Sequence, residues 1–269
     1  MQLVLYSFWP QEVSYLFKLL FENVPFDNLL IYNYNINPIV QSDSDTLQIK
    51  FTVESSCQDN NMSDIHFGHH KTDITKKRIW FPFILCRDPI VYTKAREFVK
   101  PTYFCGFGVS NAGCNLRNEL FEYISVHRYI HSFGSVKRNT DLKAPPIHTE
   151  GYIEFLKQFK FLICFENSEY PYYITEKLGN AYLAGCIPIY WGCTTAPLFL
   201  NLEAFIYVTS NDSFKDIYNR IQYIDTNEEA YMRMRSQPLF INNTIPREFS
   251  EEYLVKQIKD ILATKTSSI

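Results

Sequence analysis

The segment Phe161–Gly192 constrains the fold of this chain more than any other part of it. It reads FLICFENSEYPYYITEKLGNAYLAGCIPIYWG. An apolar run at 161–165 has the length and composition of a strand buried on both faces. A helix pattern follows Thr175, a residue type favoured as an N-cap, and Gly185 stands where a helix commonly ends. A second apolar run at 187–191 completes a predicted parallel βαβ unit.

Polar residues follow directly where the first of these strands ends. They are Glu166, Asn167 and Ser168, and open parallel sheets bind ligands beyond the carboxyl ends of their strands. In the first helical turn the dipole favours Glu176 and disfavours Lys177, each by about 0.3–1 kcal/mol. An anion bound at the helix N-terminus would explain the lysine. The alternative is an exposed surface lysine.

The rest of the chain also alternates strands and helices. Further strands are predicted at 2–8, 29–34, 47–53, 65–67, 79–85, 102–107 and 205–208. Further helices are predicted at about 13–20, 115–125, 152–159, 214–224, 228–236 and 254–262. This alternation predicts an α/β fold with two Rossmann-like domains. Because Pro89 and Pro101 interrupt the stretch between them, we place the boundary there, with domains at 1–95 and 96–269.

Composition narrows the classes of function. The chain has 269 residues and a net charge of −3, so it has no broad basic surface and nucleic acid is not expected as its partner. Its seven cysteines form no C-x-x-C pair, which indicates a reducing compartment without disulfides. No apolar run approaches the ~20 residues that span a membrane, and the start MQLVLYSFWPQE lacks the basic region of a signal peptide. We expect a cytoplasmic protein without a transmembrane segment; its oligomeric state stays open.

Two groups of residues have spacings that metal sites use. Asp43 and Asp45 form a D-x-D motif, but aspartate and serine are also common in turns, and we expect a loop. His66, His69 and His70 could contribute to a zinc site, but no further ligand is spaced to complete it, so a surface loop is expected. The sequence therefore predicts no metal site.

Arg117 is a second candidate cation for the site that contains Lys177. It follows the strand at 102–107 and a glycine-containing turn, and it lies near the start of the next helix. Because adjacent strand ends meet at one crevice, we expect both cations there, where helix N-termini can help them bind a diphosphate without a metal. A pyrophosphate leaving group needs such neutralisation as its bond breaks.

The central segment resembles the signature of the α-1,3/1,4-fucosyltransferase family, roughly F-E-N-S-x-x-x-x-Y-[VI]-T-E-K. Two upstream segments, VSNAGCNLRNELFEYIS and FGSVKRNT, resemble other parts of the same family, so the resemblance covers about 105–240. It implies two Rossmann-like domains facing a cleft, which is the GT-B architecture, with GDP-fucose as donor and inversion at the fucose anomeric carbon. By position, Arg117 and Lys177 look like the diphosphate ligands, and Asn167, Tyr173 and Glu176 look like further donor ligands.

The resemblance also implies a catalytic residue in the first domain. The family's general base is a glutamate in a Y-T-G-E-N segment, and Phe51-Thr52-Val53-Glu54 holds the corresponding place here. Glu54 is therefore the predicted base, although valine and serine stand where the family has glycine and asparagine.

The implied activity is that of an inverting glycosyltransferase. It would move L-fucose from GDP-fucose to the 3-OH of an N-acetylglucosamine or glucose unit of a glycan, without a tightly bound cofactor and without a strict need for metal. Two alternatives remain open at this point: a transferase of the same architecture that uses another GDP-sugar, and a catalytically inactive protein that binds a nucleotide or sugar.

Overall fold

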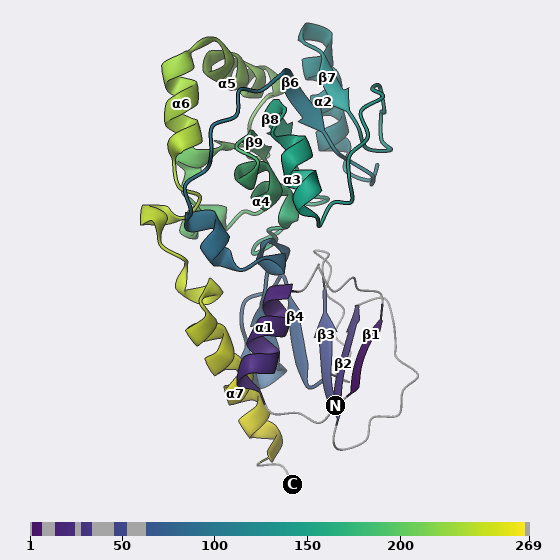
Figure 1. Cartoon of the computed structure of the whole chain (residues 1–269), viewed down its shortest axis with the longest axis vertical. Coiled ribbons are helices and arrows are strands. Elements are labelled where there is room, and N and C mark those ends of the chain that lie inside the picture. The colour runs from purple at the N-terminus through teal and green to yellow at the C-terminus, as the bar shows by residue number, and fades with distance from the viewer. Residues whose placement is uncertain (1, 7–13, 25–27, 34–45, 53–62, 267–269) are drawn as a thin grey trace. The chain divides into compact units, whose positions relative to one another are not determined.

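The chain is divided into two compact units, each built on one parallel sheet (Figure 1). The computed structural model describes residues 2–6, 14–24, 28–33, 46–52 and 63–266. The first unit comprises Met1–Pro89, Pro171–Thr175 and Ile245–Ile269, and the second comprises Ile90–Tyr170 and Glu176–Thr244. The predicted base Glu54 and the D-x-D motif at 43–45 lie outside the described residues.

The first unit has a five-stranded sheet whose strands follow the order of the chain. They are β1 (Gln2–Tyr6), β2 (Asn28–Asn33), β3 (Thr46–Phe51), β4 (Ile65–Gly68) and β5 (Arg78–Trp80), all parallel. Two helices of this unit, α1 (Ser14–Asn23) and α7 (Glu251–Thr266), contact each other. Apolar residues of β2, β3 and β4 are buried, so these strands form the centre of the core.

The second unit has a five-stranded parallel sheet in the order β10-β9-β8-β6-β7. Its strands are β6 (Tyr103–Phe107), β7 (Ile130–Ser132), β8 (Phe159–Ile163), β9 (Ile187–Tyr190) and β10 (Ile206–Tyr207). Its helices are α2 (Asn115–His127), α3 (Glu150–Leu156), α4 (Glu176–Leu183), α5 (Phe214–Thr226) and α6 (Glu228–Ser236). Because β7 and β8 lie on opposite sides of β6, the strand order reverses between β6 and β8, and such a reversal opens a ligand crevice at the carboxyl ends of the strands.

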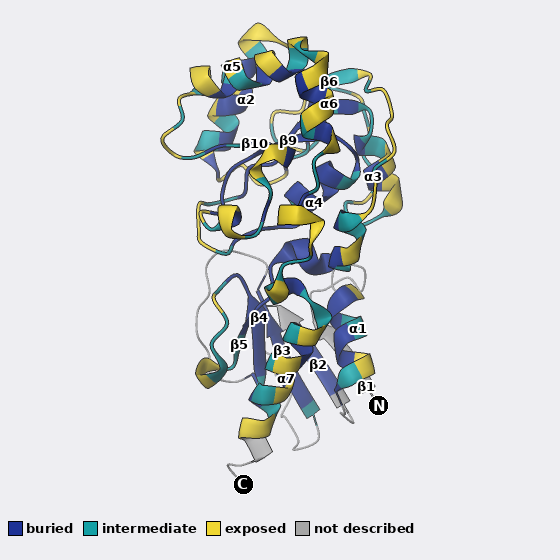
Figure 2. Ribbon diagram, turned by 90° about the vertical axis from the view of Figure 1, so that its left-hand side faces the viewer, coloured by how far each residue is buried: buried dark blue, intermediate teal, exposed yellow. Residues whose placement is uncertain are grey.

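The predicted βαβ unit is present as β8, α4 and β9. Figure 2 shows α4 largely in the buried class, and its face with Leu178, Ala181 and Tyr182 is among the buried residues. Gly185 ends the helix with a φ of +78° and donates its N–H to the carbonyl of Tyr182 at 2.9 Å. The expected helix end is therefore confirmed, and α/β architecture is confirmed in both units.

Several elements differ from the sequence-based expectation. The helix expected over 152–159 ends at Leu156, because the carbonyl of Gln158 already accepts from the amides of Thr102 and Tyr103 and so joins the sheet. The stretch Phe83–Cys86 is a 3-10 turn and not a strand, with Leu85 bonded back to the carbonyl of Pro82. Other 3-10 turns lie at Ile74–Lys76, Pro89–Thr93, Ala196–Leu198, Leu202–Ala204, Ile241–Asn243 and Arg247–Phe249.

The expectation of a surface loop at the three histidines is wrong for His66 and His69. His66 lies in β4 and is 6 % exposed, and His69 is 3 % exposed. The strand lies between β3 and β5 in its sheet, and the Oγ1 of Thr52 lies 2.8 Å from the Nε2 of His66, which gives the buried ring a hydrogen-bond partner.

The division of the chain also differs from the predicted domains 1–95 and 96–269. The main boundary, at Pro89, is close to the predicted one, but α7 and the segment Pro171–Thr175 belong to the first unit. The reason for α7 is packing, because Leu254 and Ile258 are buried and the helix contacts α1 and β5. Across the described residues, none of the helices is both long and apolar enough to cross a bilayer. The six cysteines in those ranges are buried, and none of them forms a disulfide.

Candidate functional site

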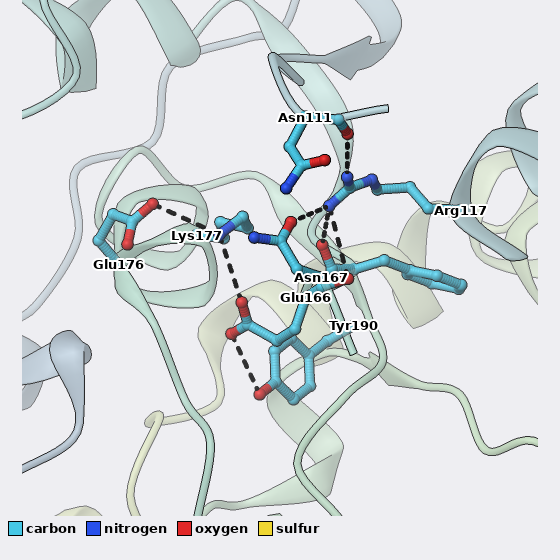
Figure 3. Close-up of polar contacts among 8 residues, drawn as sticks. Asn111, Arg117, Glu166, Asn167, Glu176, Lys177 and Tyr190 are labelled. Carbon is cyan, nitrogen blue, oxygen red and sulfur yellow. Dashed lines mark hydrogen bonds and ion pairs between the residues drawn. The ribbon is translucent and has the colours of Figure 1, made fainter. Parts of the chain in front are cut away.

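Two neighbouring strands of the second unit each lead into a helix that carries a predicted cation. β6 leads through a glycine-containing loop to α2 with Arg117 near its start, and β8 leads through the segment 164–175 to α4 with Lys177 in its first turn. β6 and β8 are paired in parallel at the point where the strand order reverses. The structure therefore brings the two cations to the same edge of the sheet, as expected (Figure 3).

Arg117 is fully buried and ties α2 to the end of β8. Its Nη1 donates to the carbonyl of Phe165 at 2.9 Å and to the Oδ1 of Asn167 at 3.2 Å. Its Nη2 donates to the carbonyl of Asn111, in the loop after β6, at 2.5 Å. One planar guanidinium thus joins both strand-end segments, a use for which its fixed fork of donors suits arginine better than lysine.

Lys177 lies between two carboxylates. Its Nζ is 3.4 Å from the Oε2 of Glu166 and 3.6 Å from the Oε1 of Glu176 (Figure 3). Burial lowers the pKa of Lys177, but the two carboxylates outweigh it and hold that pKa above its ordinary value. The side chain of Lys177 is 27 % exposed whereas that of Glu166 is 0 % exposed, so the ammonium is the member of the pair that a solute can approach.

Glu166 follows β8, and hydrogen bonds hold both its carboxylate and its backbone. Its Oε1 accepts from the hydroxyl of Tyr190 at 3.4 Å, and its backbone N–H donates to the carbonyl of Trp191 at 2.9 Å. Burial, with a further contribution from Glu166, raises the pKa of Tyr190 well above its ordinary value, so the hydroxyl stays protonated and donates.

Glu176 borders a small cavity at the start of α4. The cavity has a volume of about 40 Å³, and Tyr152, Lys177 and Asn180 are among its lining residues. The side chain of Glu176 is 9 % exposed. A carboxylate, an amide and a phenol that border one cavity offer both acceptors and donors, which is the chemistry that binds hydroxyl groups.

The structure does not place Tyr173 in the same unit as the other predicted ligands. Tyr173 is 1 % exposed within the first unit, where its ring lies edge-on to His69 with centroids 4.7 Å apart. The preceding carbonyl, of Tyr172, accepts from the Nε1 of Trp80 at 2.9 Å. Arg117, Asn167, Glu176 and Lys177 form one group, whereas the position of Glu54 lies outside the described residues.

The sequence assigned no role to several residues that contact Arg117 or Lys177 or support these contacts. Glu166 was placed at the strand end, but Tyr190 read only as part of a buried strand and Asn111 only as part of a loop. An acid that directly ends an apolar run was the available signal for Glu166, since charged residues are seldom fully buried without a partner. Within the described ranges no three or more His, Cys, Asp or Glu side chains are grouped so that they could hold a metal ion.

Comparisons with known proteins agree with this geometry. The sequence model for the C-terminal part of glycosyltransferase family 10 (fucosyltransferase) matches residues 100–236. A protein of Acanthamoeba polyphaga mimivirus with a provisional fucosyltransferase name is 29 % identical over 243 residues, which cover 86 % of this chain and 40 % of the viral protein. The alpha-(1,3)-fucosyltransferase FucT of Helicobacter pylori is 31 % identical over 131 residues, covering 49 % of this chain and 26 % of FucT. The chain thus spans less than half the length of these two relatives.

Solved structures show the same fold. A crystal structure of an alpha1,3-fucosyltransferase with GDP superposes with a TM-score of 0.73 at 20 % identity, covering 98 % of this chain and 90 % of that one. A crystal structure of an alpha1,3-fucosyltransferase with GDP-fucose gives a TM-score of 0.71, also at 20 % identity, covering 97 % and 90 %. The fold class expected from the sequence is therefore confirmed. Since the family model covers 100–236 and includes the β6–β8 crevice with both cations, the chain belongs to glycosyltransferase family 10, the fucosyltransferases.

Proposed function

We propose that this chain is a fucosyltransferase that transfers L-fucose from GDP-fucose to a sugar hydroxyl of a glycan, with inversion at the anomeric carbon. The observation that carries the proposal is the placement of Arg117 and Lys177 at the same edge of the sheet, at the strand-order reversal between β6 and β8. Such a crevice with helix N-termini and two cations suits a nucleoside diphosphate.

In this proposal the two cations have different tasks. Lys177 is partly exposed and meets the diphosphate directly, where its charge offsets the charge that develops on the leaving GDP. Arg117 is fully buried and donates to Phe165 and Asn167, so it fixes the shape of the segment that contacts the donor and adds positive charge beneath it. Glu176 and Asn167 supply acceptors and donors for hydroxyl groups of the donor.

The proposed reaction is one displacement. The acceptor hydroxyl oxygen bonds to the fucose anomeric carbon, the bond from that carbon to the β-phosphate oxygen breaks, and GDP leaves with its electron pair. A general base takes the proton of the attacking hydroxyl, and we assign this role to Glu54. The acceptor is proposed to be the 3-OH of an N-acetylglucosamine or glucose unit.

Binding and transfer assays test the proposal in sequence. GDP, GDP-fucose and GDP-mannose are first compared by calorimetry, and GDP-fucose is then offered with an array of glycans. We expect GDP and GDP-fucose to bind, and fucose to appear on a glycan with the anomeric configuration opposite to that of the donor by NMR. Preferred binding and transfer of mannose would support a same-fold transferase with another donor. Binding without transfer to any glycan would support an inactive nucleotide-binding protein.

A further inference from the structure

We propose that Glu166 is a positioning residue, whose buried carboxylate, fixed by Tyr190, holds the ammonium of Lys177 where it meets the diphosphate of the donor. This inference rests on the proposed function and adds to the site a residue that acts through Lys177.

The first argument is burial. The side chain of Glu166 is 0 % exposed, and an ionised carboxylate in a protein interior destabilises the fold unless it is paired and hydrogen-bonded. Apolar side chains of similar volume in place of both Glu166 and Lys177 would commonly be tolerated at least as well as a buried ion pair. Stability alone therefore does not explain this buried pair. A role for Glu166 is to be sought in its effect on its partner, Lys177.

The second argument is that the neighbouring backbone makes room for this side chain. The carbonyl of Trp191 accepts the amide of Glu166 at 2.9 Å, which fixes Glu166 against the segment after β9. The next residue, Gly192, has a φ of +139°, and a Cβ there would lie 2.5 Å from the Cγ of Glu166. A side chain at 192 would displace the glutamate stem, so this glycine is required for the observed position of Glu166.

The third argument is that the two oxygens of Glu166 have different partners. The Oε2 faces Lys177 at 3.4 Å, and the Oε1 accepts from Tyr190 at 3.4 Å. Tyr190 is fully buried in β9 and cannot follow a moving side chain. The hydroxyl of Tyr190 therefore holds the carboxylate in one orientation. The carboxylate in turn limits the positions that the ammonium of the flexible Lys177 side chain can take.

A second carboxylate competes with Glu166 for the ammonium of Lys177, so Glu166 must be fixed if it is to hold that ammonium in place. Glu176, its neighbour in the first turn of α4, lies 3.6 Å from the same ammonium. If Glu166 lost its charge, Glu176 would still attract the ammonium, which would shift toward the helix, away from the strand end where Arg117 is anchored. Among the described residues, the groups whose charge acts on Lys177 are Glu176, Glu166 and Arg117, and the thiol of Cys164, whose pKa burial raises, also lies near.

A double-mutant cycle on GDP binding tests this role. Glu166→Gln keeps the shape of the side chain and removes its charge, and we expect it to weaken GDP binding about tenfold by calorimetry. In a Lys177→Ala background the same change should alter the affinity less than about twofold, because its effect passes through the lysine. Tyr190→Phe should act in the same direction with a smaller effect. Glu203→Gln, which alters an exposed glutamate outside this segment, is the control and should bind GDP normally.

A second readout needs no nucleotide. Acylation of individual lysines is followed by mass spectrometry between pH 7 and 9.5, with Lys256 as internal reference. In Glu166→Gln one of the negative charges that raise the pKa of Lys177 is removed, whereas burial and Arg117 still lower that pKa. Lys177 should therefore react several-fold faster in Glu166→Gln than in the wild type.

The outcomes separate this inference from the proposed function. Unchanged GDP affinity and unchanged Lys177 reactivity in both Glu166→Gln and Tyr190→Phe would overturn it. An equal loss of affinity with and without Lys177 would also overturn it, since that result assigns Glu166 a purely structural role. A wild type that does not bind GDP, while Glu166→Gln still speeds acylation of Lys177, would refute the proposed function and support the tie between the two residues.

Discussion

Arg117 Nη1 donates to Asn167 Oδ1 across 3.2 Å, and this hydrogen bond joins the first turn of α2 to the segment after β8. The side chain of Asn167 is thereby held in place by the guanidinium of Arg117, which is itself fully buried. Two residues that sequence comparison would treat as separate ligands are one structural unit, and a change in either should affect the other.

Arg117→Lys should destabilise the fold as well as weaken GDP binding. A single ammonium cannot reach both Phe165 and Asn111 as the guanidinium does, and a buried carbonyl such as that of Phe165 costs about 1–3 kcal/mol when it is left without a donor. Thermal unfolding should show a melting temperature lower by several degrees. Arg233→Lys, at an exposed arginine of α6, is the matched control. An unchanged melting temperature in Arg117→Lys would contradict the anchoring role.

Lys177→Ala should also lower stability, contrary to what its place in the helix dipole suggests. The dipole term disfavours a first-turn lysine by about 0.3–1 kcal/mol, but removal of Lys177 leaves the fully buried Glu166 without its ammonium partner. Because the folded-state pKa of Lys177 is raised, its contribution is complete below the unfolded-state pKa of about 10.4 and is lost only as pH rises through the higher folded value. The stability difference from the wild type, measured by urea unfolding, should therefore stay constant from pH 6 to 9.

GDP binding should not require a divalent metal. We expect the positive charge of Arg117 and Lys177 at the strand ends to supply the neutralisation that a metal provides elsewhere. GDP affinity is to be measured with EDTA and with added Mg²⁺ or Mn²⁺. A change of more than about tenfold, roughly 1.4 kcal/mol, would refute metal-free binding. Asp43→Ala and Asp45→Ala should leave the affinity nearly unchanged.

Glu54→Gln should separate binding from catalysis. The amide keeps the shape of the side chain and cannot take a proton, so kcat should fall about 10²–10⁴-fold while GDP affinity is retained. Steady-state kinetics with saturating GDP-fucose, together with calorimetry, measure the two effects. Near-normal turnover in Glu54→Gln would show that another group is the base.

His66 and His70 should make the first unit sensitive to acid. Burial, then His70 and Lys50, lower the pKa of His66 to about 3, and burial lowers the pKa of His70 to about 4. Both folded-state values lie below the unfolded value of about 6.5, so their contribution to stability is complete above pH 6.5 and is lost as pH falls toward 4.

The measurement is chemical unfolding of the wild type and of His66→Gln with His70→Gln at pH 7 and pH 4.5. One pKa unit corresponds to about 1.4 kcal/mol, so the wild type should lose a few kcal/mol that the double variant does not lose. His127→Gln, at an exposed histidine, should behave like the wild type. Equal acid sensitivity of all three proteins would contradict this account.

The sequence predicted the parts of the fold that have local signals. The segment from β8 to β9 was readable because its strands are apolar runs and because Gly185 marks the end of α4. Lys177 was conspicuous because it opposes the helix dipole. The three-residue strand β7 was missed, since Ile130–Ser132 is too short for a periodic pattern.

The parts of the fold and of the site that the sequence did not predict depend on contacts between positions far apart in the chain. That Tyr190 reaches Glu166 follows from the pairing of Ile163 with Ile189, and nothing in either strand's sequence states this register. The assignment of α7 to the first unit likewise depends on packing against α1 and β5, because an amphipathic helix does not reveal which surface it will cover.

The discontinuity of the first unit has a consequence for biogenesis. A ribosome releases β1 to β5 early, whereas Ile245–Ile269, with the α7 residues Leu254 and Ile258, emerges only after the whole second unit. The second unit is encoded inside the first and can fold while its host is still incomplete. The apolar surface that α7 covers is therefore exposed on the nascent chain through most of synthesis, and this is the stage at which a chaperone would be needed.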